Sequence, residues 1–351
     1  MPIDPRTHTR IGAGSRIARR MTPVAEAPTD EAIARAAALL RAGELVAFPT
    51  ETVYGLGADA ANAQAVRRIF AAKGRPADHP VIVHIPDVSH VLRWASALPD
   101  AARLHAAAFW PGPLTLILPR AAGVHDVVTG GQDSVGLRVP SHPVARALLH
   151  AFGSGIAAPS ANRFGRISPT QAAHVAGDLG ASVGLILDGG ACEVGIESTI
   201  VAVTGGVPTL LRPGAIGVRE LAQVLGHAPA APDRTAPRAS GTLASHYAPK
   251  TPAMLAPADA LHAEIVQLVD RDEDVAILAR TVRRPVDFAG AWIGAPLDAA
   301  AYAHDLYANL RTLDAANADV ILIETPPADD AWLAVRDRLG RATRGEDDDR
   351  D

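Results

Sequence analysis

The chain has 351 residues, a hydrophobic content of 48% and a formal net charge of −5. This length predicts roughly two domains, and the negative charge argues against a protein whose main role is nonspecific nucleic-acid binding. A single cysteine, Cys192, excludes an internal disulfide framework and a cysteine-based zinc site. No apolar run approaches the length of a membrane span and no signal-type segment opens the chain, so we expect a soluble, cytoplasmic protein without a membrane partner.

The N-terminal segment, residues 1–27, is rich in arginine and has no hydrophobic period. This composition predicts a flexible arm. The first convincing helix spans residues 31–41, with Asp30 as its N-cap and Gly43 as its C-terminal stop.

A strand follows at residues 45–48 and is stopped by Pro49, which cannot donate a hydrogen bond to a sheet. Hydroxyl and carboxyl side chains come directly after it, among them Thr52. We expect Gly55 and Gly57 to let the backbone turn tightly at this point.

The next helix, residues 63–72, delivers Lys73 and Arg75 into a loop broken by Gly and Pro. Among the 33 basic residues only Lys73 and Lys250 are lysines. A lysine offers a compact charge with three rotatable donors, where arginine offers a planar fork. Two fixed cations beside hydroxyls and a carboxylate indicate a site for a polyanionic ligand.

The rest of the first domain is dominated by short strands, predicted at residues 81–84, 114–118, 134–140, 156–158, 185–187, 197–203 and 209–214. Many connections are too short for crossovers, so the sheet should be mixed rather than doubly wound. Ser168 or Thr170 is expected to cap a helix that begins near Gln171. We expect this domain to cover residues 28–226.

A proline-rich linker is predicted at residues 227–252, although Tyr247 is a costly residue for a simple spacer. Strands and helices alternate over residues 253–343, which predicts a small open α/β sheet. Residues 344–351 form an acidic, solvated tail.

Several familiar catalytic motifs are missing: there is no phosphate-binding P-loop, no His-Glu-x-x-His and no Gly-x-Ser-x-Gly. His79 and His84 lack a third ligand at metal spacing, so we interpret them as hydrogen-bonding groups. What remains is a set of cations and hydroxyls at strand ends, namely Lys73, Arg75, Arg138 and Arg212 with Thr52, Ser134, Ser160, Asn162, Ser168 and Ser198. Four converging cations would need an anionic partner, for which a triphosphate with Mg²⁺ is the natural choice. No metal ligand from the protein is expected.

Six ordered motifs resemble one known family: Pro49-Thr-Glu-Thr-Val-Tyr-Gly-Leu-Gly57, Lys73-Gly-Arg-Pro76, Ala158-Pro-Ser-Ala-Asn162, Ser168-Pro-Thr170, Glu197-Ser-Thr-Ile-Val201 and Arg212-Pro-Gly214. They look like the YrdC-like family, and Ser245-His-Tyr-Ala-Pro249 resembles the interdomain segment of its long, two-domain L-threonylcarbamoyladenylate synthases. The resemblance covers about residues 28–343. It implies an α/β protein with a YrdC-like twisted mixed sheet and flanking helices, plus a smaller C-terminal open α/β, Rossmann-like domain.

The resemblance also implies a reaction. L-threonine and bicarbonate or CO2 would form an N-carboxylate that attacks the α-phosphorus of ATP, giving threonylcarbamoyl-AMP and pyrophosphate. A downstream threonylcarbamoyl transferase complex would then modify tRNA adenosine next to the anticodon. Mg²⁺ would arrive with ATP through its phosphates, and no stable nucleic-acid binding by this chain is expected.

Residue roles follow from the same resemblance. Lys73 and Arg75 would be the catalytic cations. Threonine would be held by Thr52, His84, Arg138, Ser198 and the backbone at Ala158. ATP would be held by Lys73, Arg75, His79, Ser134, Ser160, Asn162, Ser168, Arg212 and Tyr247, with Tyr247 closing the linker over the nucleotide as a lid.

The composition also bears on two other possible functions. A double-stranded RNA-binding protein would show exposed Lys and Arg, which two lysines and a net negative charge argue against. A related carbamoyl-transfer enzyme could use the same nucleotide cleft, but its accessory zinc-finger segments would need many more cysteines than the one present.

Overall fold

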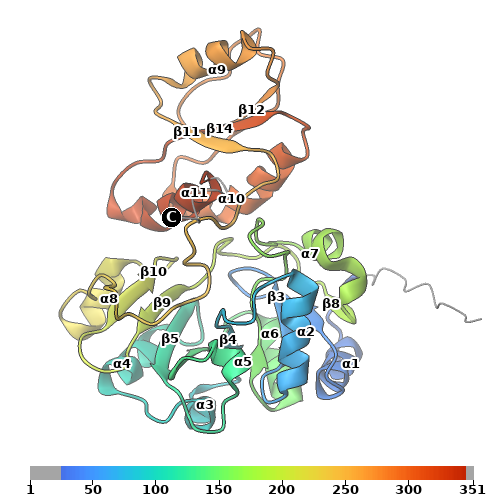
Figure 1. The fold of residues 1–351 in the computed structure, drawn as a ribbon, viewed down its shortest axis with the longest axis vertical. Helices are drawn as coiled ribbons and strands as arrows, with labels where there is room; N and C mark the ends of the chain where they lie inside the picture. Colours follow the sequence, from blue (N-terminus) through green and yellow to red (C-terminus); the bar gives the residue numbers. More distant parts are fainter. Residues whose placement is uncertain (1–24, 345–351) are drawn as a thin grey trace, which may run out of the picture.

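A computed structural model describes residues 25–344 as two stacked α/β units (Figure 1). Most of the predicted N-terminal arm and nearly all of the acidic tail, residues 1–24 and 345–351, lie outside the described residues. No helix within residues 25–344 is both long enough and apolar enough to cross a membrane.

The larger unit is built on one ten-stranded sheet with the order β1-β8-β2-β3-β7-β4-β6-β5-β9-β10. Parallel and antiparallel pairs alternate irregularly through it, which confirms the predicted mixed sheet. Its strands are β1 Ala25–Glu26, β2 Val46–Phe48, β3 Gly55–Asp59, β4 Ile82–His84, β5 Leu114–Pro119, β6 Ser134–Arg138, β7 Ile156–Ala157, β8 Leu185–Leu187, β9 Thr199–Ala202 and β10 Thr209–Arg212.

Helices cover both faces of this sheet. The pair α1 and α6 packs through one apolar cluster, whereas α2, α4 and α7 pack in the larger cluster on the other face. The helices are α1 Asp30–Arg41, α2 Ala63–Lys73, α3 Val91–Trp94, α4 Asp100–Phe109, α5 Asp126–Thr129, α6 Pro143–Phe152, α7 Ala172–Leu179 and α8 Val218–Leu225, with 3₁₀ turns η1 Val88–His90 and η2 Gly180–Ser182.

Three local predictions were wrong. The N-cap of α1 is Thr29, whose hydroxyl accepts from the amide of Ala32, and Asp30 lies in the first turn instead. Helix α7 begins after Gln171 without a side-chain cap, because the Ser168 hydroxyl donates to Glu197. Glycines 55 and 57 do not turn the chain: both lie in β3.

The glycine at position 57 serves close packing between strands. A Cβ there would lie 2.8 Å from the Phe48 ring and 2.9 Å from Ile156. The sequence pattern could not distinguish this use of glycine from a turn, because both need the missing side chain.

The smaller unit holds a four-stranded parallel sheet in the order β11-β14-β12-β13. Figure 1 shows α10 and α11 on the side of this sheet that faces the larger unit and α9 on the opposite side. The elements are β11 Ala253–Ala256, α9 Leu261–Val269, β12 Val275–Ala279, β13 Trp292–Gly294, α10 Ala299–Asp314, β14 Val320–Glu324, η3 Asp330–Trp332 and α11 Leu333–Ala342.

The two units share an apolar core. Val53, Ile167 and Ile196 of the larger unit pack in the same buried cluster as residues of α10 and α11. Tyr247 from the connecting segment joins this cluster, 1% exposed, and stacks on Tyr307 with ring centroids 5.7 Å apart. The joint core fixes the smaller unit over the strand ends where the predicted site residues lie.

Candidate active site

A pocket lies at these strand ends, between the large sheet and the connecting segment. Eleven of the fourteen predicted site residues line it: Thr52, Lys73, Arg75, His84, Arg138, Ala158, Ser160, Asn162, Ser198, Arg212 and Tyr247. They come from eight different segments of the chain. The fold therefore brings together most of the set that the sequence placed at strand ends.

Arg138 is the cation on the side of the pocket where β4 and β6 end. It stands at the end of β6, in register with His84 at the end of β4. One guanidinium nitrogen lies 2.7 Å from a carboxylate oxygen of Glu51, and another donates to the Thr52 hydroxyl at 2.9 Å. Burial would raise the pKa of Glu51, but Arg138 lowers it below its usual value. The pair places a fixed positive group beside a hydroxyl, an arrangement suited to a carboxylate ligand.

His84 contributes a neutral imidazole next to this cation. Burial and the nearby Arg138 hold its pKa well below the usual value. Its ring meets Phe48 edge-on, with centroids 6.2 Å apart. The neutral ring offers a hydrogen bond without adding charge.

Lys73 closes α2 and is only 3% exposed. Its ammonium donates to the carbonyl oxygens of Ser160 and Asn162 at 2.5 and 2.6 Å, and it lies 3.4 Å from the Asn162 amide oxygen. Burial, then repulsion from Arg75, lowers its pKa well below the usual value. A compact ammonium fits three converging oxygens where a planar fork would not, which explains a lysine at this position.

Arg75 and Arg212 occupy the side of the pocket that the connecting segment covers. Arg75 donates to the carbonyl of Pro80 at 2.8 Å, and burial lowers its pKa to about 10. Arg212 donates to the carbonyl of Ser198 through two nitrogens and to the carbonyl of Ser240 at 2.7 Å. Carbonyl oxygens of the chain thus contact both cations that we expect to bind phosphate.

Five buried nitrogens around the pocket have no hydrogen-bond partner within residues 25–344. They are Arg75 Nε, His84 Nδ1, Arg138 Nε, Arg138 Nη2 and His246 Nδ1, of which Arg138 Nη2 faces the Glu51 carboxylate as an ion pair. Buried polar atoms are normally paired, so a cluster of unpaired ones in one pocket indicates a place for a polar ligand.

The burial of the cations also bears on the alternative function. Arg138 and Arg212 are 4% and 3% exposed, respectively, and Lys73 is similarly hidden. A double-stranded RNA-binding surface needs exposed basic groups, so these cations do not form one.

Three predicted nucleotide-binding residues do not line the pocket. His79 lies edge-on to Phe164, which does line it, at a centroid distance of 5.4 Å. Ser134 is at the start of β6, the opposite end from Arg138. Ser168 is fully buried behind the pocket, where its hydroxyl donates to Glu197 at 2.5 Å.

The connecting segment is folded against the pocket rather than extended as a spacer. Ser240, Gly241, His246 and Tyr247 all line it. Tyr247 has a positive φ of 64°, and its hydroxyl donates to the carbonyl of Gly241 at 3.3 Å. Burial lowers the pKa of His246 to about 3, so its ring is neutral.

The carboxylates and histidines around this pocket do not gather into a cluster within residues 25–344. No group of three His, Cys, Asp or Glu side chains within residues 25–344 could hold a metal ion. Glu197, the carboxylate among the described residues that line the pocket, already accepts hydrogen bonds from Ser168 and Tyr307. Mg²⁺ would therefore have to be held by phosphate oxygens.

Three charged residues of this region are not among the predicted site residues: Glu51, Glu197 and Arg338. Both glutamates lie inside quoted motifs, next to residues that were chosen. Arg338 belongs to the apolar stripe of α11, with Val335 and Leu339, and is 1% exposed. A lone charge on an apolar helical stripe was the signal that could have identified it.

Comparisons with known proteins agree along the whole described chain. The Sua5/YciO/YrdC family model, described as "Telomere recombination", matches residues 38–214, and "Threonylcarbamoyl-AMP synthase, C-terminal domain" matches residues 216–343. The threonylcarbamoyl-AMP synthase of Pyrococcus abyssi is 39% identical over 88% of this chain and 93% of its own length. That of Bacillus subtilis is 40% identical over 90% and 94%.

A solved structure gives the same result in three dimensions. The crystal structure of P. abyssi Sua5 complexed with L-threonine superposes with a TM-score of 0.84 at 37% identity, covering 92% of this chain and 97% of that one. Family models for both units, near-full-length relatives and a matching fold all agree. This chain belongs to the Sua5/YciO/YrdC family and has its two-domain, threonylcarbamoyl-AMP synthase form.

Proposed function

We propose that this protein is a threonylcarbamoyl-AMP synthase, which converts L-threonine, bicarbonate and ATP into threonylcarbamoyl-AMP, pyrophosphate and water. The observation that carries the proposal is the pocket itself: four buried cations line it, and several nitrogens of its lining side chains have no hydrogen-bond partner within residues 25–344. Two anions must meet there for the reaction, the carboxylated amino acid and the triphosphate. Cations that are fixed in place before binding lower the free energy needed to bring the two anions together.

The threonine end is the Arg138 side. Arg138 would pair with the amino-acid carboxylate while Glu51 and Thr52 keep its guanidinium in place. Thr52, His84, Ser198 and the backbone at Ala158 complete the set. The threonine-complexed P. abyssi relative supports an amino-acid site in this fold.

The nucleotide end is the Lys73, Arg75 and Arg212 side. Arg75 and Arg212 would exchange carbonyl partners for phosphate oxygens, and Arg75 would stabilise charge on the leaving pyrophosphate. Lys73 holds the 160–162 loop through its three contacts, which positions Ser160 and Asn162 for ATP. His79, Ser134 and Ser168 stay in our proposal as outer contacts to the nucleotide. Mg²⁺ bound through the phosphates would offset their negative charge.

The two α/β units and the segment between them would have different roles. Residues 28–226 would form the catalytic domain, 227–252 a segment that closes over ATP through Tyr247, and 253–343 a C-terminal domain that supports this segment. The product is an activated acyl adenylate, so we propose that a downstream threonylcarbamoyl transferase complex consumes it for tRNA modification in the cytoplasm.

The test is pyrophosphate release from ATP and Mg²⁺ in bicarbonate buffer, with and without L-threonine. We expect release only when threonine and bicarbonate are both present. Arg138→Ala should lower turnover about 100-fold or more, whereas the exposed control Arg103→Ala should leave it unchanged. Threonine-independent release, or none from a folded protein that binds ATP, would contradict the proposal.

A further inference from the structure

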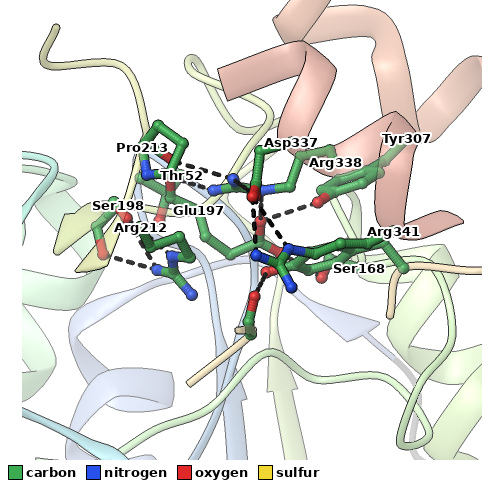
Figure 2. A network of polar contacts seen from close by, with 12 residues as sticks. Thr52, Ser168, Glu197, Ser198, Arg212, Pro213, Tyr307, Asp337, Arg338 and Arg341 are labelled. Atoms are coloured by element: carbon green, nitrogen blue, oxygen red, sulfur yellow. Dashed lines mark hydrogen bonds and ion pairs between the residues drawn. The ribbon is translucent and has the colours of Figure 1, made fainter. Parts of the chain in front are cut away.

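The C-terminal unit places one arginine inside the catalytic unit. Arg338 belongs to α11, yet its side chain is completely buried and its guanidinium points at the motif segments of the large sheet (Figure 2). A buried arginine is costly unless each of its donors finds a partner, so the partners indicate its role.

Apart from Asp337 of its own helix, whose carboxylate accepts from Nη1 at 2.7 Å, those partners are the two segments that carry Ser198 and Arg212. Arg338 Nε donates to the Glu197 carboxylate at 2.9 Å, and Nη2 lies 3.3 Å from the Glu197 carbonyl oxygen. Nη1 donates to the carbonyl of Pro213 at 2.9 Å. Arg338 is therefore bound to the residues directly beside two members of the site.

The Glu197 carboxylate extends this contact to a third site residue. One of its oxygens accepts from the Ser168 hydroxyl at 2.5 Å, and the other accepts from Tyr307 of α10 at 2.8 Å. Figure 2 shows Glu197 between Ser168 on one side and Tyr307 and Arg338 on the other. Both domains thus hold the same buried carboxylate.

The charge balance gives this contact a consequence for the site. Burial alone would raise the pKa of Glu197, but Arg338 and then Arg212 lower it to about 2, so the carboxylate is ionised. Without Arg338, this buried negative charge would have Arg212 as its remaining nearby guanidinium. It would then compete with ATP phosphates for Arg212 and repel them.

Arg338 also reaches the connecting segment. Its guanidinium lies over the Tyr247 ring at 5.3 Å from the centroid. The same group therefore contacts the strand ends and the residue that we expect to close over the nucleotide.

We propose that Arg338 is a positioning residue for catalysis: by neutralising Glu197 and fixing the 197–198 and 212–213 segments, the C-terminal domain completes the nucleotide side of the catalytic domain's pocket. The inference rests on the proposed function, because ATP is the anion that Arg212 would bind less tightly if Glu197 were left without Arg338. It predicts that the harm done by removing Arg338 comes from the unpaired charge of Glu197.

The experiment compares four full-length variants with the wild type: Arg338→Met, Arg338→Lys, Arg338→Met with Glu197→Gln, and Arg336→Met as a control. Arg336 lies on the same helix, is exposed, and donates to the carbonyl of Ala328. The measurements are kcat, KM for ATP and for threonine, affinity for ATP by calorimetry, and the melting temperature.

Arg338→Met should lower kcat/KM for ATP about 100-fold and weaken ATP binding. Adding Glu197→Gln should raise kcat/KM for ATP at least tenfold above that of Arg338→Met, because the negative charge that competes with ATP is gone. Arg338→Lys should keep part of the wild-type kcat/KM, because it keeps the positive charge at position 338. Arg336→Met should match the wild type.

Two results would overturn the inference: unchanged ATP kinetics and ATP affinity in Arg338→Met, or no recovery from Glu197→Gln in a double variant that melts at the temperature of Arg338→Met. The second result would leave Arg338 as a contact that only holds the domains together. Failure of the proposed function would look different, because the wild type itself would then release no pyrophosphate with threonine, while the calorimetric comparison would still test the inference.

Discussion

The two sheets of this protein differ in what lies at the carboxyl ends of their parallel strands. At the carboxyl ends of the parallel pair β4 and β6, His84 Nδ1 and Arg138 Nε remain without a hydrogen-bond partner within residues 25–344. At the carboxyl ends of the parallel pair β12 and β14, the buried carboxylate of Glu324 accepts from the backbone amides of residues 280, 281 and 282, at 2.6, 2.7 and 3.1 Å. One sheet end is open to a ligand, and the other is filled by the chain itself.

This difference is what we expect if the larger unit binds the ligands and the smaller one supports it. Open α/β sheets bind ligands beyond the carboxyl ends of their strands, and consecutive backbone amides there are suited to an anion. In the C-terminal domain Glu324 takes the place of that anion. This domain contacts the larger unit through α10 and α11, which supply Tyr307 and Arg338.

The largest effect should come from changing the shape, not the charge, of the cation at Lys73. We expect Lys73→Arg to lower kcat/KM for ATP about 100- to 1,000-fold. The planar fork cannot reproduce three contacts from one nitrogen to the 160–162 loop, so Ser160 and Asn162 would shift. Steady-state pyrophosphate release measures this loss.

Lys250→Arg is the matched control, because Lys250 is the only other lysine and is exposed. It should keep wild-type kinetics. If Lys73→Arg also kept them, the Lys73 ammonium would not be organising the loop.

The next effect concerns stability against acid. The pKa of Glu197 is about 2 in the folded protein, against 4.5 in an unperturbed side chain. A lowered folded pKa stabilises the protein above the unfolded value, and this contribution is lost as pH falls from about 4.5 towards 2. Its full size is about 3 kcal/mol.

Urea unfolding of the wild type and of Glu197→Gln at pH 7, 5, 4 and 3 measures this contribution. The free energy of unfolding should fall more steeply below pH 4.5 in the wild type than in the variant. The exposed control Glu31→Gln should keep the steep wild-type dependence. Parallel curves for wild type and Glu197→Gln would mean that Glu197 is not held ionised by Arg338.

The sequence could predict the mixed sheet, the second α/β unit and eleven pocket residues, because local patterns and motifs encode them. It could not predict what depends on packing between distant segments. Glycine 57 looked like a turn residue, but it is needed for close contact with Phe48. Ser168 was predicted as a possible helix cap, and its hydroxyl is instead bound to Glu197. Arg338 lies 141 residues from Glu197, so no local pattern could connect them.

The smallest effect should come from the filled sheet end, through Glu324→Gln. The amide would retain one accepting oxygen, while its NH2 group would face donors that the second carboxylate oxygen now satisfies, including the Thr281 hydroxyl. We expect the free energy of unfolding to fall by about 1–3 kcal/mol, with kcat and both KM values unchanged. Thermal melting and steady-state kinetics on the same preparation measure the two effects, with Glu31→Gln again as the control.

Altered KM for ATP would show that this sheet end communicates with the catalytic pocket, and an unchanged melting temperature would show that the carboxylate is not needed to hold the 280–282 loop. Lost stability with intact kinetics is the result that our proposal requires, since in it the C-terminal domain affects catalysis through Tyr307 and Arg338 rather than through Glu324.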